Sequence, residues 1–432
     1  MIKDLKKKID TKKANIGIIG LGYVGLPLAL EFAKKGFVVL GIDINNERVN
    51  AINKGKSQIT DIPDNEIRRA ITQKKFIATT NYSAISKLDA LIICVPTPLR
   101  KTKEPDLSYI IDAAKKLAKY LKKGTLISLE STTYPGTTEE RVLPIFEKRG
   151  LKLDKDFYLV FSPERIDPGN VKYTTSNITK VIGGVSSDSA SLAKALYEKI
   201  ISKVIVVSSS RAAEMVKLLE NSFRSVNIAL ANELAVICHK MGIDVWEIVD
   251  AAATKPFGYI AFYPGPGLGG HCIPIDPLYL TWKARMEGLK PRFIELASQV
   301  NSYMPQYVVE RLTEILRKHR KELKCSKILV LGVAYKKNVN DTRESPAIEI
   351  IELLKRKGAL VSYHDPYVPA LRVNRADFKS MPLSESILKQ QDCVAIITDH
   401  ANVNYARVIK NAELIFDTRN AIKQKNKKVI KL

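Results

Sequence analysis

Near its N-terminus the chain reads NIGIIGLGYVG, residues 15–25. The first five residues are mostly branched and apolar, which is typical of a buried parallel strand. The next six have the spacing G-x-G-x-x-G, and residues 26–36 have helical periodicity and end on a glycine. The stretch therefore predicts the strand, turn and helix that begin a parallel α/β sheet.

A second apolar run, residues 37–42, ends on Asp43, 18 residues after Gly25. Strand, glycine turn, helix, strand and acid follow one another as in a dinucleotide-binding fold, where the acid accepts a hydrogen bond from a ribose hydroxyl. An acid at this position favours NAD over NADP. Arg48 is either a contact on the phosphate side of the adenosine or an exposed helix arginine. We predict NAD as the cofactor.

Polar residues follow the next three apolar runs. Residues 90–95 are followed by Pro96-Thr97-Pro98, residues 125–129 by Glu130-Ser131-Thr132-Thr133, and residues 157–161 by Ser162-Pro163-Glu164-Arg165. Each segment alone is usually an ordinary turn. Because an open parallel sheet binds ligands at the carboxyl ends of its strands, the three together predict a site. Residues 203–207 are expected to be the last strand of this domain, which we bound at 1–210.

A helical pattern without a break runs from Arg211 to about Met241. Glu214, Lys217 and Asn221 form one polar stripe on it, among many apolar residues: Met215, Val216, Leu218, Leu219, Phe223, Val226, Ile228 and Leu230. A helix that is apolar on most sides is expected to be buried, and a buried lysine needs a partner. The alternative is a solvated stripe. We expect this helix to link two domains and to carry a dimer contact.

A glycine-rich loop, GPGLGGHCIPIDP, covers residues 265–277. It is too irregular for a strand or a helix, and we interpret it as a loop shaped around a ligand. Asp276 and Pro277 suit an N-cap and a first helical position, so Cys272 would lie just before a helix N-terminus, which favours the thiolate. The alternative is that Cys272 is a small buried apolar residue and Asp276 only a cap.

A second helical pattern, from Pro291 to Lys318, completes a central segment that we bound at residues 211–318. Residues 319–432 repeat the strand and helix rhythm of a nucleotide fold without a G-x-G-x-x-G turn, and we expect them to hold a nucleotide. His364-Asp365-Pro366 is expected to be a turn rather than a catalytic pair. The fold class is thus α/β, with two Rossmann-like doubly wound domains joined by a long central helix.

The composition limits the function classes. No apolar run approaches the length that spans a bilayer, and no apolar segment follows the basic N-terminus, so neither a membrane span nor a signal peptide is expected. The five cysteines are far apart and form no CxxC pair, which argues against a metal site and suits reduced thiols in the cytoplasm. The net charge is +24, but the lysines are scattered, which favours a solvated surface or a polyanionic small substrate over nucleic acid.

A hydride acceptor and a low-pKa thiol in one chain suggest oxidation through an aldehyde. The thiol adds to the aldehyde, the thiohemiacetal loses a hydride to become a thioester, and water releases a carboxylate. Lys217 is the candidate cation for the oxyanion, and Asp276 and Glu164 are candidate general bases.

Along nearly its whole length the chain resembles the UDP-glucose/UDP-mannose dehydrogenase family of nucleotide-sugar 6-dehydrogenases. Members of this family oxidise the C6 alcohol of a UDP-sugar to the carboxylate with two NAD⁺. The matching pieces are GLGYVG with Asp43, VPTP (95–98), Ser131-Thr132, SPER (162–165), residues 214–221, GGHC (269–272) with Asp276, and DTRES (341–345).

The resemblance implies a role for each matched residue. Cys272 is the expected nucleophile, Lys217, Asn221 and Asp276 would support the oxyanion and the water, and Thr132 and Glu164 would serve in hydrolysis. Expected NAD contacts are Gly20, Gly22, Tyr23, Val24, Gly25, Asp43, Arg48, Thr97, Thr132 and Arg343. Expected substrate contacts are Glu164, Arg165, Lys217, Asn221, Gly267, Gly269 and Lys336. The resemblance also implies a homodimer built on the long helix and a third domain that holds UDP.

Differences between this chain and the branches of the family indicate which sugar it takes. The UDP-glucose branch usually reads NPEFLxEG where this chain has SPERIDPGN, residues 162–170. That segment, LESTTYPGT (129–137) and PGPGLGGHC resemble UDP-N-acetylglucosamine 6-dehydrogenases, which serve polysaccharide biosynthesis. Arg165 in place of an apolar residue is a physical reason to expect altered sugar contacts. UDP-N-acetylmannosamine, UDP-N-acetylgalactosamine and UDP-glucose remain alternatives, as do a two-electron hydroxyacid dehydrogenase of the 6-phosphogluconate type and a non-catalytic NAD-binding or nucleic-acid-binding protein.

Overall fold

The computed structural model describes residues 1–432 except 60–61, 167–172, 271 and 375. The chain divides into two compact units, and the division falls inside one long helix, α8 (Ser210–Met241). The first unit comprises residues 1–220 and 278–289, and the second comprises residues 221–277 and 290–432. Each unit contains one large sheet and is described separately.

The sheet of the first unit has eight strands in the order β3-β2-β1-β4-β5-β6-β7-β8. Their bounds are β1 (Asn15–Ile19), β2 (Val38–Ile42), β3 (Phe76–Thr79), β4 (Ala90–Ile93), β5 (Thr125–Leu129), β6 (Phe157–Phe161), β7 (Lys180–Gly184) and β8 (Val204–Val207). The order from β3 through β6 is that of a doubly wound dinucleotide-binding sheet, as the sequence predicts. All neighbouring strands are parallel except β6 and β7, which run antiparallel.

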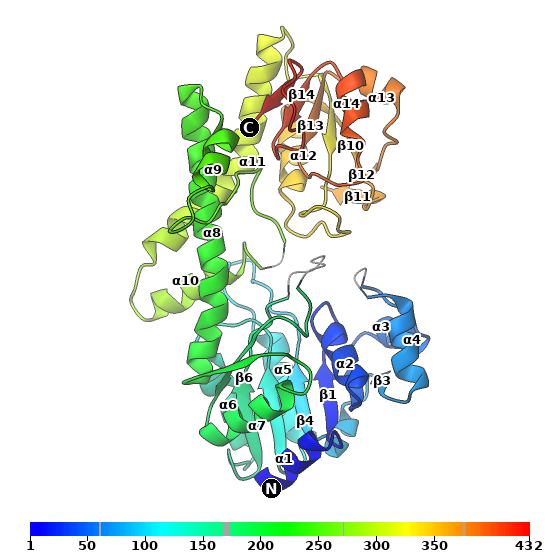
Figure 1. Cartoon of the computed structure of the whole chain (residues 1–432), viewed down its shortest axis with the longest axis vertical. Helices are drawn as coiled ribbons and strands as arrows, with labels where there is room; N and C mark the ends of the chain where they lie inside the picture. Colours follow the sequence, from blue (N-terminus) through cyan, green and yellow to red (C-terminus); the bar gives the residue numbers. More distant parts are fainter. Residues whose placement is uncertain (60–61, 167–172, 271, 375) are drawn as a thin grey trace. The chain divides into compact units, whose positions relative to one another are not determined.

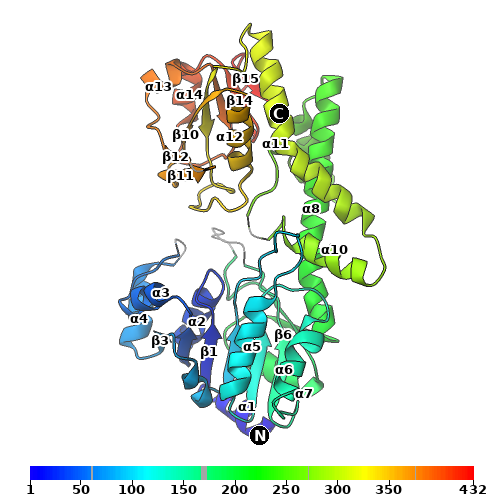
Figure 2. The same ribbon diagram turned by 180° about the vertical axis from the view of Figure 1, so that it is seen from behind.

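Helices cover both faces of this sheet. They are α1 (Ile2–Asp10), α2 (Gly25–Lys34), α3 (Asn46–Asn53), α4 (Asp64–Thr72), α5 (Ser108–Tyr120), α6 (Leu143–Glu147) and α7 (Ser187–Tyr197). Helices α1 and α7 lie over one face (Figure 1), whereas α5 and α6 lie over the other (Figure 2). The core between α1, α2, α7 and the sheet is apolar and closed, with Ile9, Ile16 and Phe32 fully buried. The sequence missed β7, because a strand that begins with a lysine and ends with two glycines has little apolar pattern.

The second unit contains a five-stranded parallel sheet in the order β10-β9-β13-β14-β15. Its strands are β9 (Lys327–Leu331), β10 (Leu360–His364), β13 (Cys393–Ile396), β14 (Ile415–Asp417) and β15 (Val429–Lys431), and β11 (Ala370–Val373) with β12 (Ala376–Lys379) forms a separate antiparallel pair. The other helices are α9 (Val245–Ala252), α11 (Arg292–Lys318), α12 (Pro346–Arg356), α13 (Glu385–Lys389) and α14 (Tyr405–Asn411). One apolar core joins α11 and α12 to the sheet.

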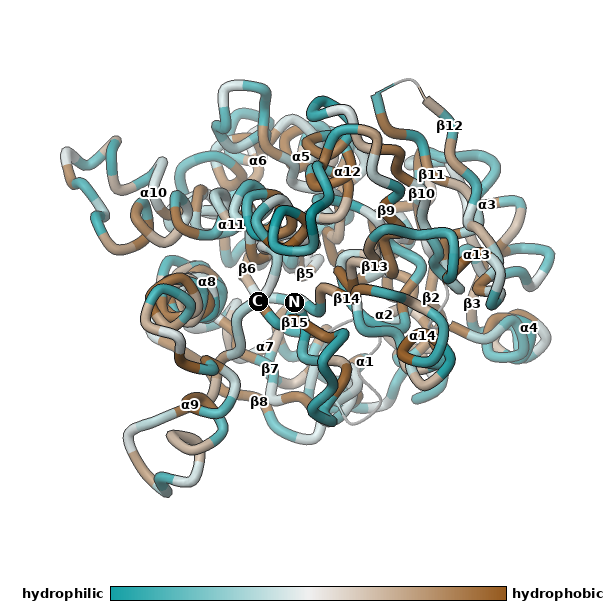
Figure 3. Tube along the Cα trace, turned by 90° about the horizontal axis from the view of Figure 1, so that it is seen from above, coloured by the Kyte–Doolittle hydropathy of each residue, from teal (hydrophilic) through white to brown (hydrophobic). Residues whose placement is uncertain are grey.

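Helix α8 is 32 residues long, as its unbroken pattern predicts. The expectation that it is buried on most sides is only partly right, because Met215, Leu219, Phe223 and Leu230 are exposed. Hydrophobic and hydrophilic residues both occur among its turns, which overlap in Figure 3 because the helix is seen nearly end-on. One side of this helix therefore presents apolar surface that the described chain does not cover.

Among the helices of the described residues, none combines the length and the apolar composition that crossing a bilayer requires.

Candidate active site

The glycine turn after β1 fits a dinucleotide pyrophosphate. Gly20 has φ +93°, and a Cβ there would lie 2.6 Å from the carbonyl oxygen of Cys94. A Cβ on Gly25 would lie 1.9 Å from the carbonyl oxygen of Gly20, so the turn can close onto α2 only with glycine. A Cβ on Gly22, in contrast, would meet no atom within 4 Å. The turn is thus packed on its protein side and leaves room at Gly22, before the N-terminus of α2, where a phosphate is favoured.

Asp43 follows β2 and is buried. Its Oδ2 accepts hydrogen bonds from the N–H of Leu21 at 2.8 Å and from the Arg48 guanidinium at 3.0 Å, and its Oδ1 accepts one from the N–H of Asn45 at 2.9 Å. Arg48 is therefore an ion-pair partner of Asp43 rather than an isolated surface arginine. A carboxylate has about four acceptor positions, so these contacts leave one for a ribose hydroxyl.

Glu164 follows β6 and has both carboxylate oxygens engaged. Its Oε1 accepts the N–H groups of Arg165 at 2.7 Å and Ile166 at 2.8 Å, and its Oε2 lies 3.4 Å from Lys180 Nζ. Burial raises the pKa of Glu164, but the charge of Lys180, these two N–H groups and Lys217 outweigh burial and hold it below its usual value. Glu164 is thus an ionised carboxylate, as a general base must be.

Lys217 is buried, and its Nζ donates to the carbonyl oxygen of Glu164 at 2.6 Å. Glu214 and Asn221 are buried as well, so the alternative of a solvated stripe is wrong. Glu164 and Lys217, two predicted site residues that are 53 positions apart in the sequence, thus lie in contact in the first unit. Arg165 extends from the same segment and donates to the carbonyl oxygen of Thr179 at 2.7 Å and to Glu220 at 2.7 Å.

Glu214 has a structural contact that the sequence did not indicate. Its carboxylate accepts the N–H of Gly136 at 2.6 Å, the N–H of Thr138 at 2.9 Å and the Thr138 hydroxyl at 2.7 Å. Burial nevertheless raises the pKa of Glu214 to about 7. This residue therefore fastens α8 to the segment after β5 that carries Thr132, which is half-buried between Ser131 and Thr133.

Thr97, in the segment after β4, is held by a residue that the sequence analysis missed. Tyr279, on α10 (Asp276–Met286), is fully buried, and its hydroxyl donates to the carbonyl oxygens of Thr97 at 2.9 Å and Pro98 at 3.2 Å. No local pattern distinguishes this tyrosine from a core aromatic residue. Its contact fixes the backbone of the predicted NAD-contact segment.

Cys272, in the second unit, is exposed on the turn that precedes α10. Its carbonyl oxygen accepts the N–H groups of Ile275 at 3.1 Å and Asp276 at 2.8 Å. The side chains of Asp276 and Asn221 are buried, and Asn221 Nδ2 donates to Asp276 Oδ2. The turn before α10 is as predicted, except that Asp276 is the first residue of the helix rather than its N-cap. The alternative of a buried Cys272 is wrong, because this residue is exposed.

The glycines of residues 265–270 pack against protein, which differs from a loop shaped around a ligand alone. A Cβ on Gly269 would lie 2.7 Å from Tyr335 Cβ, and one on Gly270 would lie 2.6 Å from the Tyr335 ring. Gly267 has φ +132°, and a Cβ there would lie 3.2 Å from Pro346. These positions therefore favour glycine, because the loop lies directly on Tyr335, which follows β9, and on Pro346, the first residue of α12.

Two further contacts anchor this loop within the second unit. Asn232 Oδ1 accepts the N–H of Gly265 at 2.9 Å, and Asn232 Nδ2 donates to Asn301 Oδ1 at 2.9 Å. Both asparagines are buried, so the amides fasten the loop to α8 and α11. Arg419, which the sequence analysis did not single out, donates to the carbonyl oxygen of Ile397 at 2.9 Å, and its guanidinium would lie 2.6 Å from a Cβ on Gly265. A side chain at 265 would therefore require the Arg419 guanidinium to shift.

The segment after β9 carries Lys336, which is half-buried, and Arg343, which is exposed and pairs with Asp341 at 2.6 Å. His364-Asp365-Pro366 forms the expected turn, since Asp365 Oδ1 accepts the N–H groups of Tyr367 and Val368. Its Oδ2 contacts His400 Nε2 at 3.0 Å and accepts the N–H of Val333 at 2.7 Å. Burial raises the pKa of Asp365, but His400 and the N–H groups hold it below its usual value. This acid therefore shapes the segment after β9.

His271 and residues 167–170 of the SPERIDPGN segment lie outside the described residues. Among the residues that the structure describes, no three His, Cys, Asp or Glu side chains gather as they would around a metal ion.

Comparisons with known proteins cover all three predicted regions. Residues 14–201 match the NAD binding domain of the UDP-glucose/GDP-mannose dehydrogenase family, residues 211–303 match its central domain, and residues 329–424 match its UDP binding domain. The family description pairs UDP-glucose with GDP-mannose, where the motifs led us to UDP-mannose.

Two similar relatives carry different sugar names. The chain is 37% identical over 416 residues to the UDP-N-acetyl-D-mannosamine dehydrogenase of Pyrococcus horikoshii, covering 95% of this chain and 96% of the relative. It is 39% identical over 361 residues to the UDP-N-acetyl-D-glucosamine 6-dehydrogenase of Pseudomonas aeruginosa, covering 83% and 84%. The solved structure of the Pyrococcus horikoshii UDP-D-ManNAc dehydrogenase superposes with a TM-score of 0.89 at 36% identity, covering 96% of this chain and 98% of that one.

Proposed function

The chain belongs to the UDP-glucose/GDP-mannose dehydrogenase family, and on this premise we propose that it oxidises the C6 alcohol of UDP-N-acetylglucosamine to the carboxylate in two NAD-dependent steps. Relatives from Pyrococcus horikoshii, Pseudomonas aeruginosa and Salmonella typhi are named as dehydrogenases of UDP-N-acetyl-D-mannosamine or UDP-N-acetyl-D-glucosamine, and the matched NAD binding domain supports NAD as the hydride acceptor. The observation that carries the proposal is the exposed thiol of Cys272, on the turn before α10. The first residue of that helix, Asp276, is buried and accepts a hydrogen bond from the buried Asn221 of α8.

NAD⁺, when bound at the glycine turn, supplies the hydride acceptor for both oxidations. Cys272 adds through its sulfur to the C6 aldehyde, so that a C–S bond forms and the carbonyl oxygen becomes an oxyanion. Lys217 supplies a positive charge and Asn221 a hydrogen-bond donor for this oxyanion. Loss of a hydride from C6 then leaves a thioester on Cys272.

The thioester is released by water. Glu164, held as an ionised carboxylate, accepts a proton from the attacking water, with Thr132 and Asp276 in support. The C–S bond breaks, the thiolate of Cys272 leaves, and the sugar carboxylate is formed. Alcohol, water and two NAD⁺ thereby become carboxylate, two NADH and three protons.

The choice of N-acetylglucosamine is supported by the sequence motifs of residues 129–137, 162–170 and 264–272 and by the relative from Pseudomonas aeruginosa. UDP-N-acetylmannosamine is the second candidate, because several relatives with that name cover 94% or more of this chain. The two sugars differ only in the configuration at C2, so a few contacts determine the preference.

The test is NADH formation with UDP-N-acetylglucosamine, UDP-N-acetylmannosamine, UDP-N-acetylgalactosamine and UDP-glucose. We expect two NADH per sugar and the highest kcat/KM with UDP-N-acetylglucosamine. Cys272→Ser should stop at the second oxidation, because an alkoxide leaves far less readily than a thiolate. A ratio of one NADH per sugar, or full activity of Cys272→Ser, would contradict the covalent scheme.

We also propose that the enzyme is a homodimer that pairs through α8, and that it works in the cytoplasm, where its five separated cysteines would stay reduced. The apolar face of α8, which we define as Phe223, Leu230, Leu234, Ile237 and Met241, supports the dimer. These side chains are between 36% and 66% exposed, and their spacing of three, four and seven residues puts them on one side of the helix.

A further inference from the structure

Three charged side chains meet at the end of β6, and we call Glu130, Lys180 and Glu164 the buried triad. Lys180 Nζ lies 2.7 Å from Glu130 Oε2 and 3.4 Å from Glu164 Oε2. Lys180 and Glu130 are almost completely buried. The resemblance to nucleotide-sugar dehydrogenases implies a role for Glu164 but none for Lys180 or Glu130.

The reversed direction of β7 is what brings Lys180 to Glu164. Strand β7 runs antiparallel to β6, with Phe161 opposite Gly183. The first residue of β7 therefore lies near the carboxyl end of β6, the edge of the sheet where Glu164 follows. In a parallel strand, Lys180 would lie at the opposite edge of the sheet. The exception in an otherwise parallel sheet thus places a cation beside the carboxylate that we assign to hydrolysis.

Lys180 is held in position from its other side. Glu130, directly after β5, accepts from Lys180 and, through Oε1, from the hydroxyl of Tyr197 on α7. That hydroxyl also contacts Ser128 Oγ at 2.9 Å. Tyr197 is fully buried, so the triad has a rigid base in the core. An unpaired lysine at this depth would be costly, whereas this one has two carboxylate partners.

We propose that Lys180, oriented by Glu130 and Tyr197, is a positioning residue that keeps the Glu164 carboxylate ionised and fixed for thioester hydrolysis. The assignment rests on the proposed function, in which Glu164 accepts the proton of the attacking water. It adds two residues to the site, Lys180 and Glu130, whose contribution is made through Glu164.

The charges around Glu164 agree with this assignment. Lys180 on β7 and Lys217 on α8 both act on the charge of Glu164, while Glu130 and the Cys94 thiol interact with Lys180. Burial lowers the pKa of Lys180, but the two carboxylates outweigh burial and raise it, so the lysine stays charged. Burial raises the pKa of Glu130, which makes Glu164 the carboxylate of the pair that stays ionised to lower pH.

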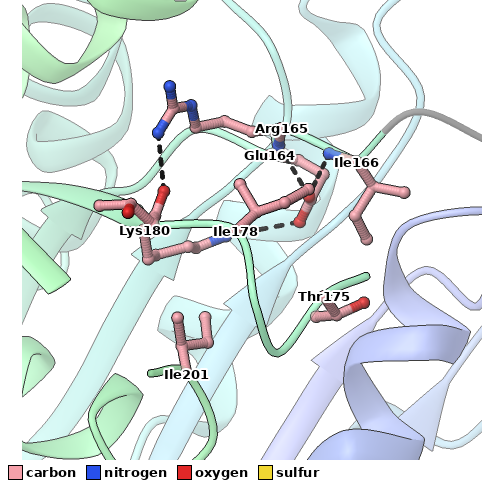
Figure 4. Close-up of a pocket in the computed structure, with 8 residues that line it drawn as sticks. Glu164, Arg165, Ile166, Thr175, Ile178, Lys180 and Ile201 are labelled. Atoms are coloured by element: carbon pink, nitrogen blue, oxygen red, sulfur yellow. Dashed lines mark hydrogen bonds and ion pairs between the residues drawn. The ribbon is translucent and has the colours of Figure 1, made fainter. Parts of the chain in front are cut away.

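The space beside the triad is small. A cavity of about 10 Å³ lies between Glu164, Arg165 and Lys180, with Thr175, Ile178 and Ile201 on its other sides (Figure 4). This volume holds about one water molecule and no sugar. Lys180 is almost completely buried and contacts Glu130 and Glu164, so we assign its effect to Glu164 rather than to direct contact with the nucleotide-sugar.

The test compares Lys180→Met with Lys180→Arg and Glu130→Gln in the full-length enzyme. Lys180→Met removes the cation that lowers the pKa of Glu164, whereas burial, which raises it, remains. The pKa of Glu164 should therefore rise by at least one unit in this variant. An acid limb should then appear in the pH profile of kcat, thioester on Cys272 should accumulate and be trapped by hydroxylamine, and KM values should stay within about two-fold. Lys180→Arg keeps the charge and should restore the profile.

A second readout does not need turnover. Carboxyl ¹³C NMR of glutamate-labelled enzyme follows Glu164, whose signal is identified by its loss in Glu164→Gln. It should titrate at higher pH in Lys180→Met but not in Glu130→Gln, which removes a negative charge from the triad. Lys203→Met, an exposed lysine before β8, is the matched control and should change neither readout.

The outcomes separate the two proposals. No NADH from any UDP-sugar with the unaltered enzyme would defeat the proposed function, while the NMR titration would still measure the effect of Lys180 on Glu164. An unaltered Glu164 titration in Lys180→Met, or the same upward shift in Lys180→Met and Glu130→Gln, would overturn the inference even in an active enzyme.

Discussion

The protonation of a buried side chain in this protein depends on the groups around it as well as on its residue type. Glu164 and Glu214 are both buried glutamates that accept backbone N–H groups. Glu164 also has a lysine at 3.4 Å and keeps a lowered pKa, whereas for Glu214 burial prevails and raises the pKa to about 7. A nearby cation therefore decides which of the two is a ready base near neutral pH.

The raised pKa of Glu214 predicts a pH-dependent stability. Between its ordinary pKa of 4.5 and about 7, Glu214 is ionised in the unfolded chain but protonated in the folded one. The folded state is therefore favoured below this window and loses stability as pH rises through it, by about 3 kcal/mol. Glu214→Gln cannot titrate. The free energy of unfolding of the unaltered protein, relative to this variant, should fall between pH 5 and pH 8 in urea denaturation.

The control for Glu214 is Glu66→Gln, an exposed glutamate on α4. Its stability relative to the unaltered protein should be nearly independent of pH in the same range. A constant difference for Glu214→Gln as well would show that the carboxylate is ionised in the folded state throughout, with its three hydrogen bonds outweighing burial.

Among the helices and strands, α8 has the most varied environment. Its polar stripe is buried against the segments after β5 and β6, and its amide residues Asn221 and Asn232 hold α10 and the glycine loop. The apolar face is exposed. A long helix with one buried polar stripe and one exposed apolar stripe is the reverse of an ordinary surface helix, and partner burial would explain it.

The apolar face of α8 predicts the effect of charge on assembly. Leu230→Glu combined with Leu234→Glu would put four acidic side chains into the proposed two-fold interface, where they would repel each other and lose water. We expect sedimentation or light scattering to show monomers at micromolar concentration. Arg224→Glu, an exposed change about 100° further around the helix than Phe223, should remain dimeric. An unaltered monomer, or a charged variant that still forms dimers, would contradict the proposed interface.

In the whole molecule, the two large sheets belong to domains for two different ligands, NAD and UDP. The first unit matches an NAD binding domain over residues 14–201, and the second contains the UDP binding domain over residues 329–424. Both follow the parallel α/β plan, but only the first has the glycine turn. In the second, Asp365 lies after β10 as Asp43 lies after β2, and its carboxylate is occupied by His400 and backbone N–H groups.

This division predicts separate protection by the two ligands. A ligand that binds only the folded state stabilises it by about 2.7 kcal/mol at 100 times its Kd. In hydrogen–deuterium exchange, NAD⁺ alone should slow exchange around residues 20–25 and Asp43, and UDP alone should slow exchange within residues 329–424. Adenosine, which lacks the pyrophosphate, serves as the control for the glycine turn. Protection of residues 20–25 by UDP and not by NAD⁺ would contradict the assignment.

Much of the fold and part of the site could be predicted because the relevant signals are local. Residues 15–43 contain the strand, glycine turn, helix, strand and acid within one short stretch. The turn has no room for a side chain at positions 20 and 25, and the sequence shows this directly because both residues are glycine. The turn before α10 and the unbroken length of α8 follow from local propensities as well. The family motifs add to this plan the expectation that Cys272 is the nucleophile.

The pairings of the site depend on residues far apart in the chain, and local pattern does not contain them. Lys180 meets Glu164 because one strand reverses direction, and Glu214 meets Gly136 and Thr138 because α8 packs against the segment after β5. Whether a lysine is solvated or buried, or a leucine on α8 covered or exposed, depends on which elements pack beside it. Backbone preferences act over a few residues, whereas burial and charge pairing act between elements that only folding brings into contact.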